Sequence, residues 1–515
     1  MLQRILENRD VSLPLSYTSM TMGGGVQAAA ARDPGKVAIR HGARTRTYAD
    51  LARRIDLIAD AVIADLGLAR GEHAAICAKN CIEYIEIALG VPEAGVALAT
   101  IDSRFTPAEI AAICDDAEAR VLFVDRHTAP LVRDAKPASV RRIIEIGPEF
   151  EDWIAAERKP VTRPPVDEWD TWTIPYTSGT TGKPKGVLIP HRSRGLVNLC
   201  ASAEFGCFTP DDCFLAMTPM HHGGGISFPI ASITFGGTLD ILEKFDAVTV
   251  LDKLKFGGVT GIFMVPTHFH SIFDLAPDVL EKYRSPQIRT IIANAAPLPQ
   301  AMKEKIVPYF GTTVLHEIYS STESGLVCSL RPPDQLRKIR CVGVPMAHVR
   351  VKIVDDDGRE CAPNQVGELL SRAPYVFSGY WRRPDETAAA FRDGWVTVGD
   401  MAKRDDEGFI YIVDRKKDMV ISGGVNIYPR EVEEVLFAHP AVADVAVVGV
   451  PDEKWGERLK AFVVVRAGHT LSAADLVEFC RDRLASYKIP KDVAQIAELP
   501  RNTNGKVLKR TLRTM

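Results

Sequence analysis

The residues best suited to chemistry gather in one short segment rich in hydroxyl groups, glycine and lysine. Residues 176–186 read YTSGTTGKPKG, with four serine or threonine hydroxyls, three glycines and two lysines. Glycine lets backbone N–H groups approach an anion, and hydroxyls and lysines add hydrogen bonds and charge. The segment is not a Walker A loop, because Pro184 stands where that motif needs its second glycine. A plain hairpin linker would not need so much threonine and lysine, so the segment predicts a polyphosphate-binding loop.

Four further residues could do chemistry but are ambiguous when each is read alone. His221 and His222 precede a run of three glycines, Glu323 follows a threonine, and Lys506 follows a glycine near the C-terminus. A histidine pair is usually packed polar surface, and single carboxylates and lysines are usually solvated. Their assignment therefore depends on the elements around them and on motifs elsewhere in the chain.

The elements that must position these residues alternate between helix and strand. Apolar residues at helical spacing predict a helix over 48–68, and Thr106 is a suitable N-cap for a helix over 107–116. Strands separated by helices predict βαβ units and a largely parallel sheet. The polar, proline-bearing residues 148–171 predict a surface connection. Short apolar runs predict strands at 74–77, 96–101, 120–125, 142–146 and 172–176.

A second, smaller α/β pattern follows the charged run at residues 414–418. It spans about 100 residues, which is a sensible size for a separate domain. We therefore expect an α/β fold in which residues 1–415 form a large body of mixed sheets flanked by helices, and residues 416–515 form a small mobile α+β domain. The elements predicted in the small domain are helices over 430–438 and 473–484 and strands at 442–450 and 460–465.

Composition excludes several classes of protein. The chain has 515 residues, with 63 Lys and Arg against 66 Asp and Glu, and a formal net charge of −3. This near-neutral charge gives no sign of the basic face or domain that a nucleic-acid-binding protein would have. The hydrophobic fraction of 46% and the charged fraction of 25% are ordinary for a globular protein, and they exclude a collagen-like, low-complexity or disordered chain.

Apolar segments and cysteines favour neither a membrane nor a secreted protein. Charges near the N-terminus interrupt any apolar signal sequence. The most apolar stretch, residues 82–101, contains three glutamates and a proline, so it predicts a core helix followed by a strand and no integral membrane segment. The ten cysteines form no C-x-x-C pair and predict reduced, packed thiols. The cytoplasm is the expected location.

Motifs along nearly the whole chain, taken in order, resemble those of the AMP-forming adenylate synthetase superfamily. That superfamily includes acyl-CoA synthetases, coumarate-CoA ligases, luciferases and peptide-synthetase adenylation domains. Residues 176–186 resemble its phosphate-binding signature, and further blocks follow in the family's order. These blocks are residues 219–223 (PMHHG), 293–298 (ANAAPL), 319–323 (YSSTE), 367–370 (GELL), 379–387 (GYWRRPDET), 398–400 (VGD), 414–418 (DRKKD), 422–429 (SGGVNIYP) and 500–506 (PRNTNGK).

The resemblance implies an enzyme that uses ATP, Mg²⁺ and coenzyme A. In the family, a carboxylate attacks the α-phosphate of ATP to give acyl-AMP and pyrophosphate, and a thiol then displaces AMP. The first step brings an anion to a polyanion, so it needs cations and oriented donors where charge builds up.

The resemblance also implies which residues hold ATP. Thr322 would contact the α-phosphate, and Glu323 would ligate Mg²⁺ together with Thr177. Asp400 and Arg415 would bind the ribose hydroxyls. The remaining ATP and AMP contacts are expected from Thr177, Ser178, Gly179, Thr180, Thr181, Lys185, Asn294, Ala295, Ala296, Tyr319 and Lys417.

A second set of residues would carry the acid, the thiol and the domain motion. Lys506 would bridge the carboxylate and the α-phosphate, as the catalytic lysine of the first step. His222 would stand between the acyl pocket and the thiol tunnel and gate them. Lys417 would be the hinge about which the C-terminal domain rotates. The remaining contacts to acid and coenzyme A are expected from His221, Gly223, Ile318, Ser320, Gly423 and Gly424.

Four positions depart from the family's pattern. Ser320 replaces the usual glycine and Asn294 replaces a small residue, both beside the acyl or adenine site. Val398 replaces the threonine of T-G-D, and Val425 replaces a frequent glutamate in the tunnel loop. We therefore expect an altered pocket and unaltered chemistry.

The acid and the thiol stay open at this point. The glycines at 223–225 suggest room beside the pocket, and Phe228, Ile318 and Tyr319 suggest apolar walls, so we expect a hydrophobic acid, either medium- or long-chain fatty or aryl. Alternatives are an enzyme that loads a carrier protein, a luciferase-like oxygenase and a non-enzymatic AMP-binding protein. The intact ATP-site residues argue against the last. The expected partners are small molecules, and a homodimer is common among such enzymes.

Overall fold

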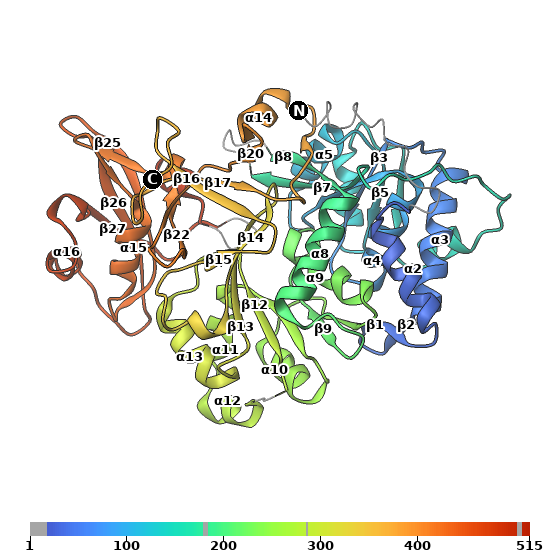
Figure 1. Cartoon of the computed structure of the whole chain (residues 1–515), viewed down its shortest axis with the longest axis horizontal. Coiled ribbons are helices and arrows are strands. Elements are labelled where there is room, and N and C mark those ends of the chain that lie inside the picture. The colour runs from blue at the N-terminus through green and yellow to red at the C-terminus, as the bar shows by residue number, and fades with distance from the viewer. Residues whose placement is uncertain (1–17, 179–183, 285–286, 502–506) are drawn as a thin grey trace. The chain divides into compact units, whose positions relative to one another are not determined.

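The chain divides into two compact units in a computed structural model that describes residues 18–178, 184–284, 287–501 and 507–515 (Figure 1). The expected α/β fold, with a large N-terminal body and a small C-terminal domain, is confirmed. The domain boundary expected between residues 415 and 416 stays a prediction. Unit 1 comprises Met1–Ile339, Pro345–Arg350 and Ser371–Val396, and unit 2 comprises Arg340–Val344, Val351–Leu370 and Thr397–Met515.

The first sheet of unit 1 places a hairpin beside a buried parallel core. Its strand order is β18-β8-β7-β4-β3-β5-β6. The strands from β7 to β6 are parallel, whereas β8 and β18 run antiparallel at one edge. Strands β3 and β4 are buried along their whole length, which is typical of parallel sheets covered on both faces. The bounds are β3 His73–Cys77, β4 Ala97–Ile101, β5 Ala119–Val124, β6 Arg142–Glu145, β7 Thr171–Ser178, β8 Pro184–Pro190 and β18 Gly379–Tyr380.

A second sheet of unit 1 has the same character. Its order includes β14-β13-β12-β11-β9-β10-β1-β2, with parallel pairing from β13 to β1 and antiparallel strands at both ends. The largely parallel pairing predicted from the sequence is therefore confirmed. The bounds are β1 Val37–His41, β2 Arg44–Thr47, β9 Cys213–Ala216, β10 Thr238–Ile241, β11 Gly261–Met264, β12 Thr290–Ala293, β13 Leu315–Ser321 and β14 Gly325–Leu330.

The two helices of unit 1 whose starts were predicted begin at Tyr48 and Pro107, as expected. The Thr106 side chain accepts a hydrogen bond from the backbone of Glu109 and completes a capping box. One expectation is wrong: residues 148–155 form a helix, because Phe150 and Trp153 are buried on its inner face. Helices α8 and α9 run side by side (Figure 1). The bounds are α3 Tyr48–Ala64, α4 Ile82–Gly90, α5 Pro107–Asp116, α7 Pro148–Ala155, α8 His191–Phe205, α9 Gly223–Thr234, α10 Ala247–Phe256, α11 Pro266–Phe273 and α13 Gln300–Phe310.

Unit 2 contains a hairpin and a small sheet covered by helices. The hairpin strands β21 and β22 are antiparallel. The small sheet has the order β24-β23-β26-β25, with β27 beside β26, and α15 and α16 pack their apolar residues on it. The predicted elements of this domain are confirmed. The bounds are β21 Asp400–Arg404, β22 Ile410–Arg415, β23 Val420–Ser422, β24 Val425–Ile427, α15 Pro429–Phe437, β25 Val442–Asp452, β26 Gly456–Val465, α16 Ala473–Arg481 and β27 Asp492–Gln495.

The helices and the cysteines of the chain bear on two further expectations, the absence of an integral membrane segment and the presence of reduced thiols. No helix in the described part of the chain has both the length and the apolar character needed to cross a bilayer. All ten cysteines are free thiols, and seven of them are buried. The prediction of reduced, packed thiols is thus confirmed for most of them.

Candidate active site

The ends of the predicted phosphate loop are held by a β-hairpin of unit 1. Thr177 of β7 lies opposite Lys185 of β8. The hydroxyl of Tyr176 donates a hydrogen bond to Oδ2 of Asp116 at 2.8 Å, which ties β7 to the end of α5. The hairpin therefore places Thr177 and Lys185 as neighbours at the base of the loop. Three predicted contacts, Gly179, Thr180 and Thr181, lie outside the described residues, as does the side chain of Ser178.

A polar cluster joins the hairpin to the predicted magnesium ligand. The Lys185 ammonium lies 5.3 Å from the centre of the Tyr380 ring and 3.6 Å from Oε1 of Glu386. The Tyr380 hydroxyl donates a hydrogen bond to Oε1 of Glu323 at 2.8 Å. Burial, and then the charge of Glu323, raise the pKa of Tyr380, so the hydroxyl keeps its proton and stays a donor. One tyrosine thus connects the predicted phosphate lysine with the predicted metal carboxylate.

Glu323 and Thr177 suit Mg²⁺ by their donor type. Both offer oxygen atoms, and Mg²⁺ is usually bound by one or two carboxylates together with phosphate oxygens. The hydrogen bond from Tyr380 orients the Glu323 carboxylate, in the way that outer partners orient metal ligands. These residues therefore fit the ion that the sequence motif implies.

A buried arginine lies behind the turn that carries Thr322 and Glu323. Nη2 of Arg194 donates a hydrogen bond to the Thr322 carbonyl at 3.2 Å, and Arg194 is only 5% exposed. Burial lowers the pKa of Arg194 to about 10, and the nearby Glu323 charge opposes this shift. The guanidinium remains charged at neutral pH, so it adds fixed positive charge beside the predicted α-phosphate contact.

The predicted adenine-wall segment follows β12 and faces the end of β13. Nδ2 of Asn294 donates a hydrogen bond to Oγ of Ser320 at 2.6 Å, so the two unusual residues of this region bond to each other. Ala295 takes a left-handed φ of 75°, which turns the segment away from the strand direction. Tyr319 and Ile318 lie on β13, and Ala296 follows in the same exposed segment as Ala295.

A buried ion pair supports this segment from behind. The Lys303 ammonium of α13 pairs with Oε2 of Glu317 on β13, and the two residues are 0% and 6% exposed. Oε1 of Glu317 accepts a hydrogen bond from the Leu298 N–H at 3.3 Å. The carboxylate thereby links the loop, the strand and the helix.

The two histidines lie where strands of both sheets of unit 1 end. Nε2 of His221 lies 3.2 Å from Oδ2 of Asp102, which follows β4, and the rings of His221 and His222 are 3.9 Å apart. Burial, and then the neighbouring His221, lower the pKa of His222 well below its ordinary value, so its imidazole is neutral at neutral pH. A neutral ring fits the predicted gating role.

Neighbouring atoms occupy the space beside two of the three glycines that follow His222. A Cβ atom on Gly225 would lie 2.0 Å from the Pro219 carbonyl oxygen, and one on Gly224 would lie 2.8 Å from the Phe263 ring. Phe228 is 2% exposed and packs among other phenylalanines. The expected room beside the pocket is therefore absent at Gly224 and Gly225. Among the described residues, nothing lies within 4 Å of a Cβ placed on Gly223.

The predicted ribose pair forms within unit 2. Asp400 and Arg415 are opposite each other on β21 and β22, and Nε of Arg415 lies 3.2 Å from Oδ1 of Asp400. Asp400 is buried and Arg415 is partly exposed, so the arginine closes one side of a buried carboxylate.

The predicted tunnel loop and hinge also lie in unit 2. Gly423 and Gly424 form a two-residue turn between β23 and β24 with φ of 59° and 80°. A Cβ atom on Gly423 would lie 2.7 Å from the Trp455 ring, so only glycine fits there. Desolvation, and then the Arg415 charge, lower the pKa of Lys417. The predicted catalytic residue Lys506 lies outside the described residues.

Four residues of these clusters escaped prediction. Tyr380 and Glu386 fall within the recognised block 379–387, but the motif does not show which residues their side chains contact. Asp102 follows a parallel strand at its carboxyl end, where ligands bind in α/β sheets, and this position was a usable signal. Arg194 is one charged residue in a helix, and nothing in the sequence marks it.

Comparisons with known proteins agree with this arrangement. The family model of the AMP-binding enzymes matches residues 26–381, and that of the AMP-binding enzyme C-terminal domain matches residues 431–506. A 2-succinylbenzoate–CoA ligase of Bacillus cereus is 33% identical over 502 residues, which cover 96% of this chain and 98% of that protein. The fatty acid–[acyl-carrier-protein] ligase ScoC of Streptomyces coeruleorubidus is 34% identical over 492 residues, 94% of either chain.

Solved structures show the same fold. ATP-bound MatB from Rhodopseudomonas palustris superposes with a TM-score of 0.89 at 28% identity, over 96% of this chain and 99% of that chain. The o-succinylbenzoate CoA synthetase of Bacillus subtilis in complex with its acyl-adenylate intermediate gives a TM-score of 0.86 at 29% identity, with the same coverage. The chain therefore belongs to the AMP-binding enzyme family, as an adenylate-forming acid–thiol ligase of the acyl-CoA synthetase type.

Proposed function

We propose that the chain joins a hydrophobic carboxylic acid to coenzyme A in two steps. The acid carboxylate attacks the α-phosphate of ATP and releases pyrophosphate, and the coenzyme A thiol then displaces AMP to give the acyl-CoA. The observation that carries this proposal is the cluster of Lys185, Tyr380 and Glu323, which sets a cation and an oriented carboxylate together at the base of the phosphate loop. One relative is named a CoA ligase, and another has been solved with ATP and a magnesium ion.

In the first step, the protein positions two anions and offsets their repulsion. Lys185 and the loop hydroxyls would hold the β- and γ-phosphates, while Arg194 adds fixed charge behind Thr322. Asp400 and Arg415 would hold the ribose, and Lys506 would bridge the attacking carboxylate and the α-phosphate. Preorganised charge at the place where charge develops is the main source of rate in such reactions. Mg²⁺ held by Glu323 would add to this charge.

In the second step, the small domain would present a different surface to the acyl-AMP. Rotation at Lys417 would withdraw Lys506 and bring up the turn at Gly423 and Gly424, whose lack of side chains suits a narrow thiol tunnel. His222, neutral and next to the acyl group, would separate the acyl pocket from this tunnel. Hinges of this kind depend on a few residues that absorb large backbone rotations.

The acid is proposed to be aryl or fatty. Relatives of similar identity are named for 2-succinylbenzoate and for fatty acids, so both classes belong in the test. The hydrogen bond between Asn294 and Ser320 would place two polar side chains at the predicted acyl or adenine site. A second candidate function is loading of an acyl carrier protein, because ScoC is named as such a ligase. The cytoplasmic location and the homodimer stay predictions.

An acid panel tests the proposal directly. Purified chain, ATP and Mg²⁺ are mixed with 2-succinylbenzoate, benzoate, octanoate, palmitate, malonate or acetate, and AMP formation is measured with coenzyme A or with a pantetheinylated carrier protein. We expect the aryl or long-chain acids with coenzyme A to give the highest kcat/KM. Higher activity with the carrier protein would select the second candidate, and AMP formation with none of the acids would overturn the proposed acid class.

A lysine variant tests the catalytic assignment. Lys506→Ala should abolish acid-dependent pyrophosphate release and leave transfer from supplied acyl-AMP to coenzyme A largely intact. Lys159→Ala, on the exposed surface of unit 1, is the matched control and should leave both reactions unchanged. Equal loss of both reactions in Lys506→Ala would contradict the assigned role.

A further inference from the structure

Three side chains of the types that bind metals meet next to the predicted acyl site. Asp102, His221 and His222 each offer a ligand atom, and these atoms all lie within 4.8 Å of one another. Asp102 follows β4 of one sheet, whereas the histidines lie between β9 of the other sheet and α9. The cluster therefore lies beyond the carboxyl ends of parallel strands, where α/β proteins bind ligands.

Both histidines carry a buried nitrogen without a hydrogen bond. Within the described parts of the chain, neither Nε2 of His221 nor Nε2 of His222 has a hydrogen-bond partner. His221 is 7% exposed and Asp102 is 2% exposed. Nε2 of His221 lies 3.2 Å from Oδ2 of Asp102 but without the alignment of a hydrogen bond. Buried polar atoms in native proteins are almost always satisfied, so two orphaned imidazole nitrogens in one cluster with a buried carboxylate indicate a missing ligand.

The surroundings hold this cluster in place. Arg104 donates to both carboxylate oxygens of Asp102, from Nε and from Nη2, each at 3.0 Å. The Thr100 hydroxyl donates to the His221 carbonyl at 3.1 Å and fixes the backbone of the histidine pair. Carboxylates that bind metals are normally hydrogen-bonded by such outer partners, which orient them. Arg104 is half exposed, so water screens its charge.

We propose that Asp102, His221 and His222 bind one divalent transition-metal ion of the zinc type. Two imidazoles and one carboxylate suit Zn²⁺, which takes four ligands at about 2.0–2.2 Å, so a small movement of the rings would close the site around the ion and leave one position open. Mg²⁺ prefers oxygen donors, and therefore this site is distinct from the one at Glu323.

Occupancy of this site would interfere with the enzyme, and this part rests on the proposed function. His222 is the proposed gate beside the acyl group, and the bound ion would take its Nε2 and place positive charge beside the acid carboxylate. We expect Zn²⁺ to inhibit acid-dependent pyrophosphate release by competition with the acid, even at saturating Mg²⁺.

Cobalt substitution tests binding separately from activity. Untagged full-length chain is titrated with Co²⁺ in the presence of Mg²⁺, and the visible absorption bands of four-coordinate Co²⁺ are recorded. We expect bands that saturate at one ion per chain and disappear when Zn²⁺ is added. His221→Ala, His222→Ala and Asp102→Asn should weaken Co²⁺ binding by more than about tenfold. Circular dichroism and unfolding temperature establish that each variant is folded.

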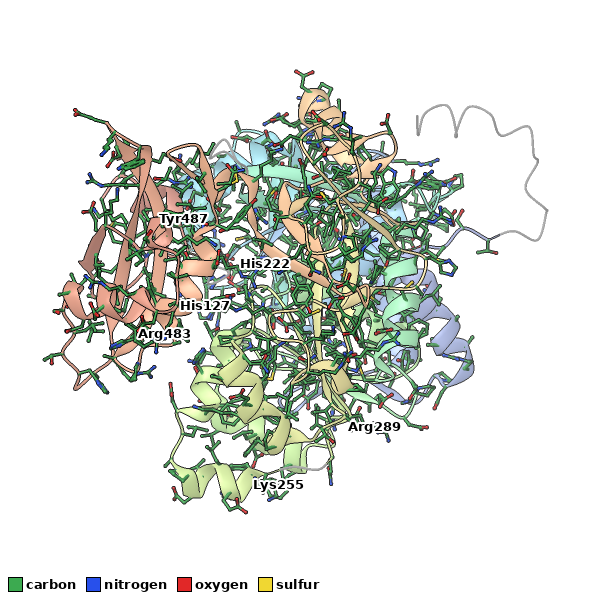
Figure 2. All side chains as sticks on the ribbon, turned by 60° about the vertical axis from the view of Figure 1, so that its left-hand side comes forward. His127, His222, Lys255, Arg289, Arg483 and Tyr487 are labelled. Carbon is green, nitrogen blue, oxygen red and sulfur yellow. The ribbon has the colours of Figure 1, made fainter. Side chains whose placement is uncertain are left out.

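Two controls locate the ion. His127→Ala removes an exposed histidine (His127 and His222 are labelled in Figure 2) and should leave the bands unchanged. Glu323→Gln removes the predicted Mg²⁺ ligand and should also leave them unchanged. Absence of the bands in the unaltered chain, or bands that persist in folded His222→Ala, would overturn the site. Intact bands without Zn²⁺ inhibition would uphold the site and contradict only its effect on the acid.

Discussion

The hydroxyl of Tyr380 donates a hydrogen bond to Oε1 of Glu323 at 2.8 Å, while the face of its ring lies 5.3 Å from the Lys185 ammonium. The tyrosine thus orients the carboxylate with one end and contacts the lysine with the other. The lysine and the Glu323 carboxylate thus contact the same uncharged side chain, and the carboxylate that pairs with the lysine is that of Glu386 at 3.6 Å. This arrangement explains why an aromatic residue with a hydroxyl group occupies position 380.

Tyr380→Phe should weaken the response of the enzyme to Mg²⁺. The substitution keeps the ring beside Lys185 but removes a hydrogen bond to a charged group, worth about 1.5–3 kcal/mol. The Mg²⁺ concentration for half-maximal pyrophosphate release should rise about tenfold. Tyr411→Phe is the matched control, because it removes a similar bond from a tyrosine to Asp405 in unit 2. An unchanged Mg²⁺ dependence in Tyr380→Phe would contradict the orienting role.

Asp400→Ala should raise the KM for ATP. The proposed ribose contact is a pair of charge-assisted hydrogen bonds from a buried carboxylate, so its loss should raise KM about 10–100-fold. Initial rates at varied ATP concentration give the result. Asp356→Ala removes an exposed carboxylate that pairs with Lys416 in the same unit and should have no effect. A KM for ATP equal in both variants would exclude the ribose contact.

Lys417→Pro should separate the two half-reactions. Proline fixes φ at the predicted hinge and so blocks rotation of the small domain. We expect acid-dependent pyrophosphate release to continue and thioester formation from supplied acyl-AMP to stop. Lys417→Ala removes the same side chain but leaves the backbone free to rotate, and it should retain thioester formation. A normal overall rate in Lys417→Pro would place the hinge elsewhere.

Lys303→Met should destabilise unit 1. Lys303 is the buried partner of Glu317, and its removal leaves a buried carboxylate unpaired, at a cost of about 3–5 kcal/mol in the free energy of unfolding. Urea unfolding measures this cost. The double variant Lys303→Met with Glu317→Gln removes both charges and should recover most of it. Arg133→Met, which breaks an exposed pair with Glu145, should cost less than about 1 kcal/mol. Equal losses for the two single variants would refute the prediction.

Stability should fall as the pH drops from neutral, in part through His191. Its Nδ1 accepts a hydrogen bond from the Met22 N–H, and burial lowers its pKa to about 4 in the folded chain. The unfolded chain takes up this proton near the ordinary pKa, so stability is fully present above that value and is lost as the pH falls toward 4. This one residue should cost about 2 kcal/mol between pH 7.5 and pH 5.

His191→Gln keeps an acceptor for the Met22 N–H but cannot be protonated. Its free energy of unfolding should therefore depend less on pH than that of the unaltered chain over this interval. His127→Gln, at an exposed histidine, should keep the original pH dependence. Parallel pH profiles for His191→Gln and the unaltered chain would show that His191 does not carry the effect.

The elements could be predicted because their signals are local. The helix over Pro107–Asp116 begins after Thr106 because that side chain caps its first turn. In the strand His73–Cys77, residues 74–77 are an unbroken apolar run. The helix Pro148–Ala155 was missed because its buried face consists of three residues within a polar, proline-bearing segment. Burial of those residues depends on neighbours that the local sequence does not contain.

The motifs predicted which residues belong to the site, but they did not predict the contacts between those residues. The motifs placed Asp400, Arg415, Lys185 and Glu323 in one ATP site, and within each unit the structure brings Asp400 to Arg415, and Lys185 and Glu323 to the same tyrosine. The space beside Gly224 and Gly225 was wrongly predicted, because a glycine can open a cavity or admit a close backbone contact and the sequence does not distinguish the two.

By itself, the sequence determined the family, the order of the elements and the identity of the candidate ATP residues, because each of these is written in contiguous stretches of chain. Only the tertiary structure decided which side chains meet. Arg194 contacts Thr322 across 128 residues, Tyr380 contacts Glu323 across 57, and Asp102 approaches His221 from a different sheet. The physical reason is that such contacts follow from the packing of helices and sheets, whose relative placement depends on the whole core.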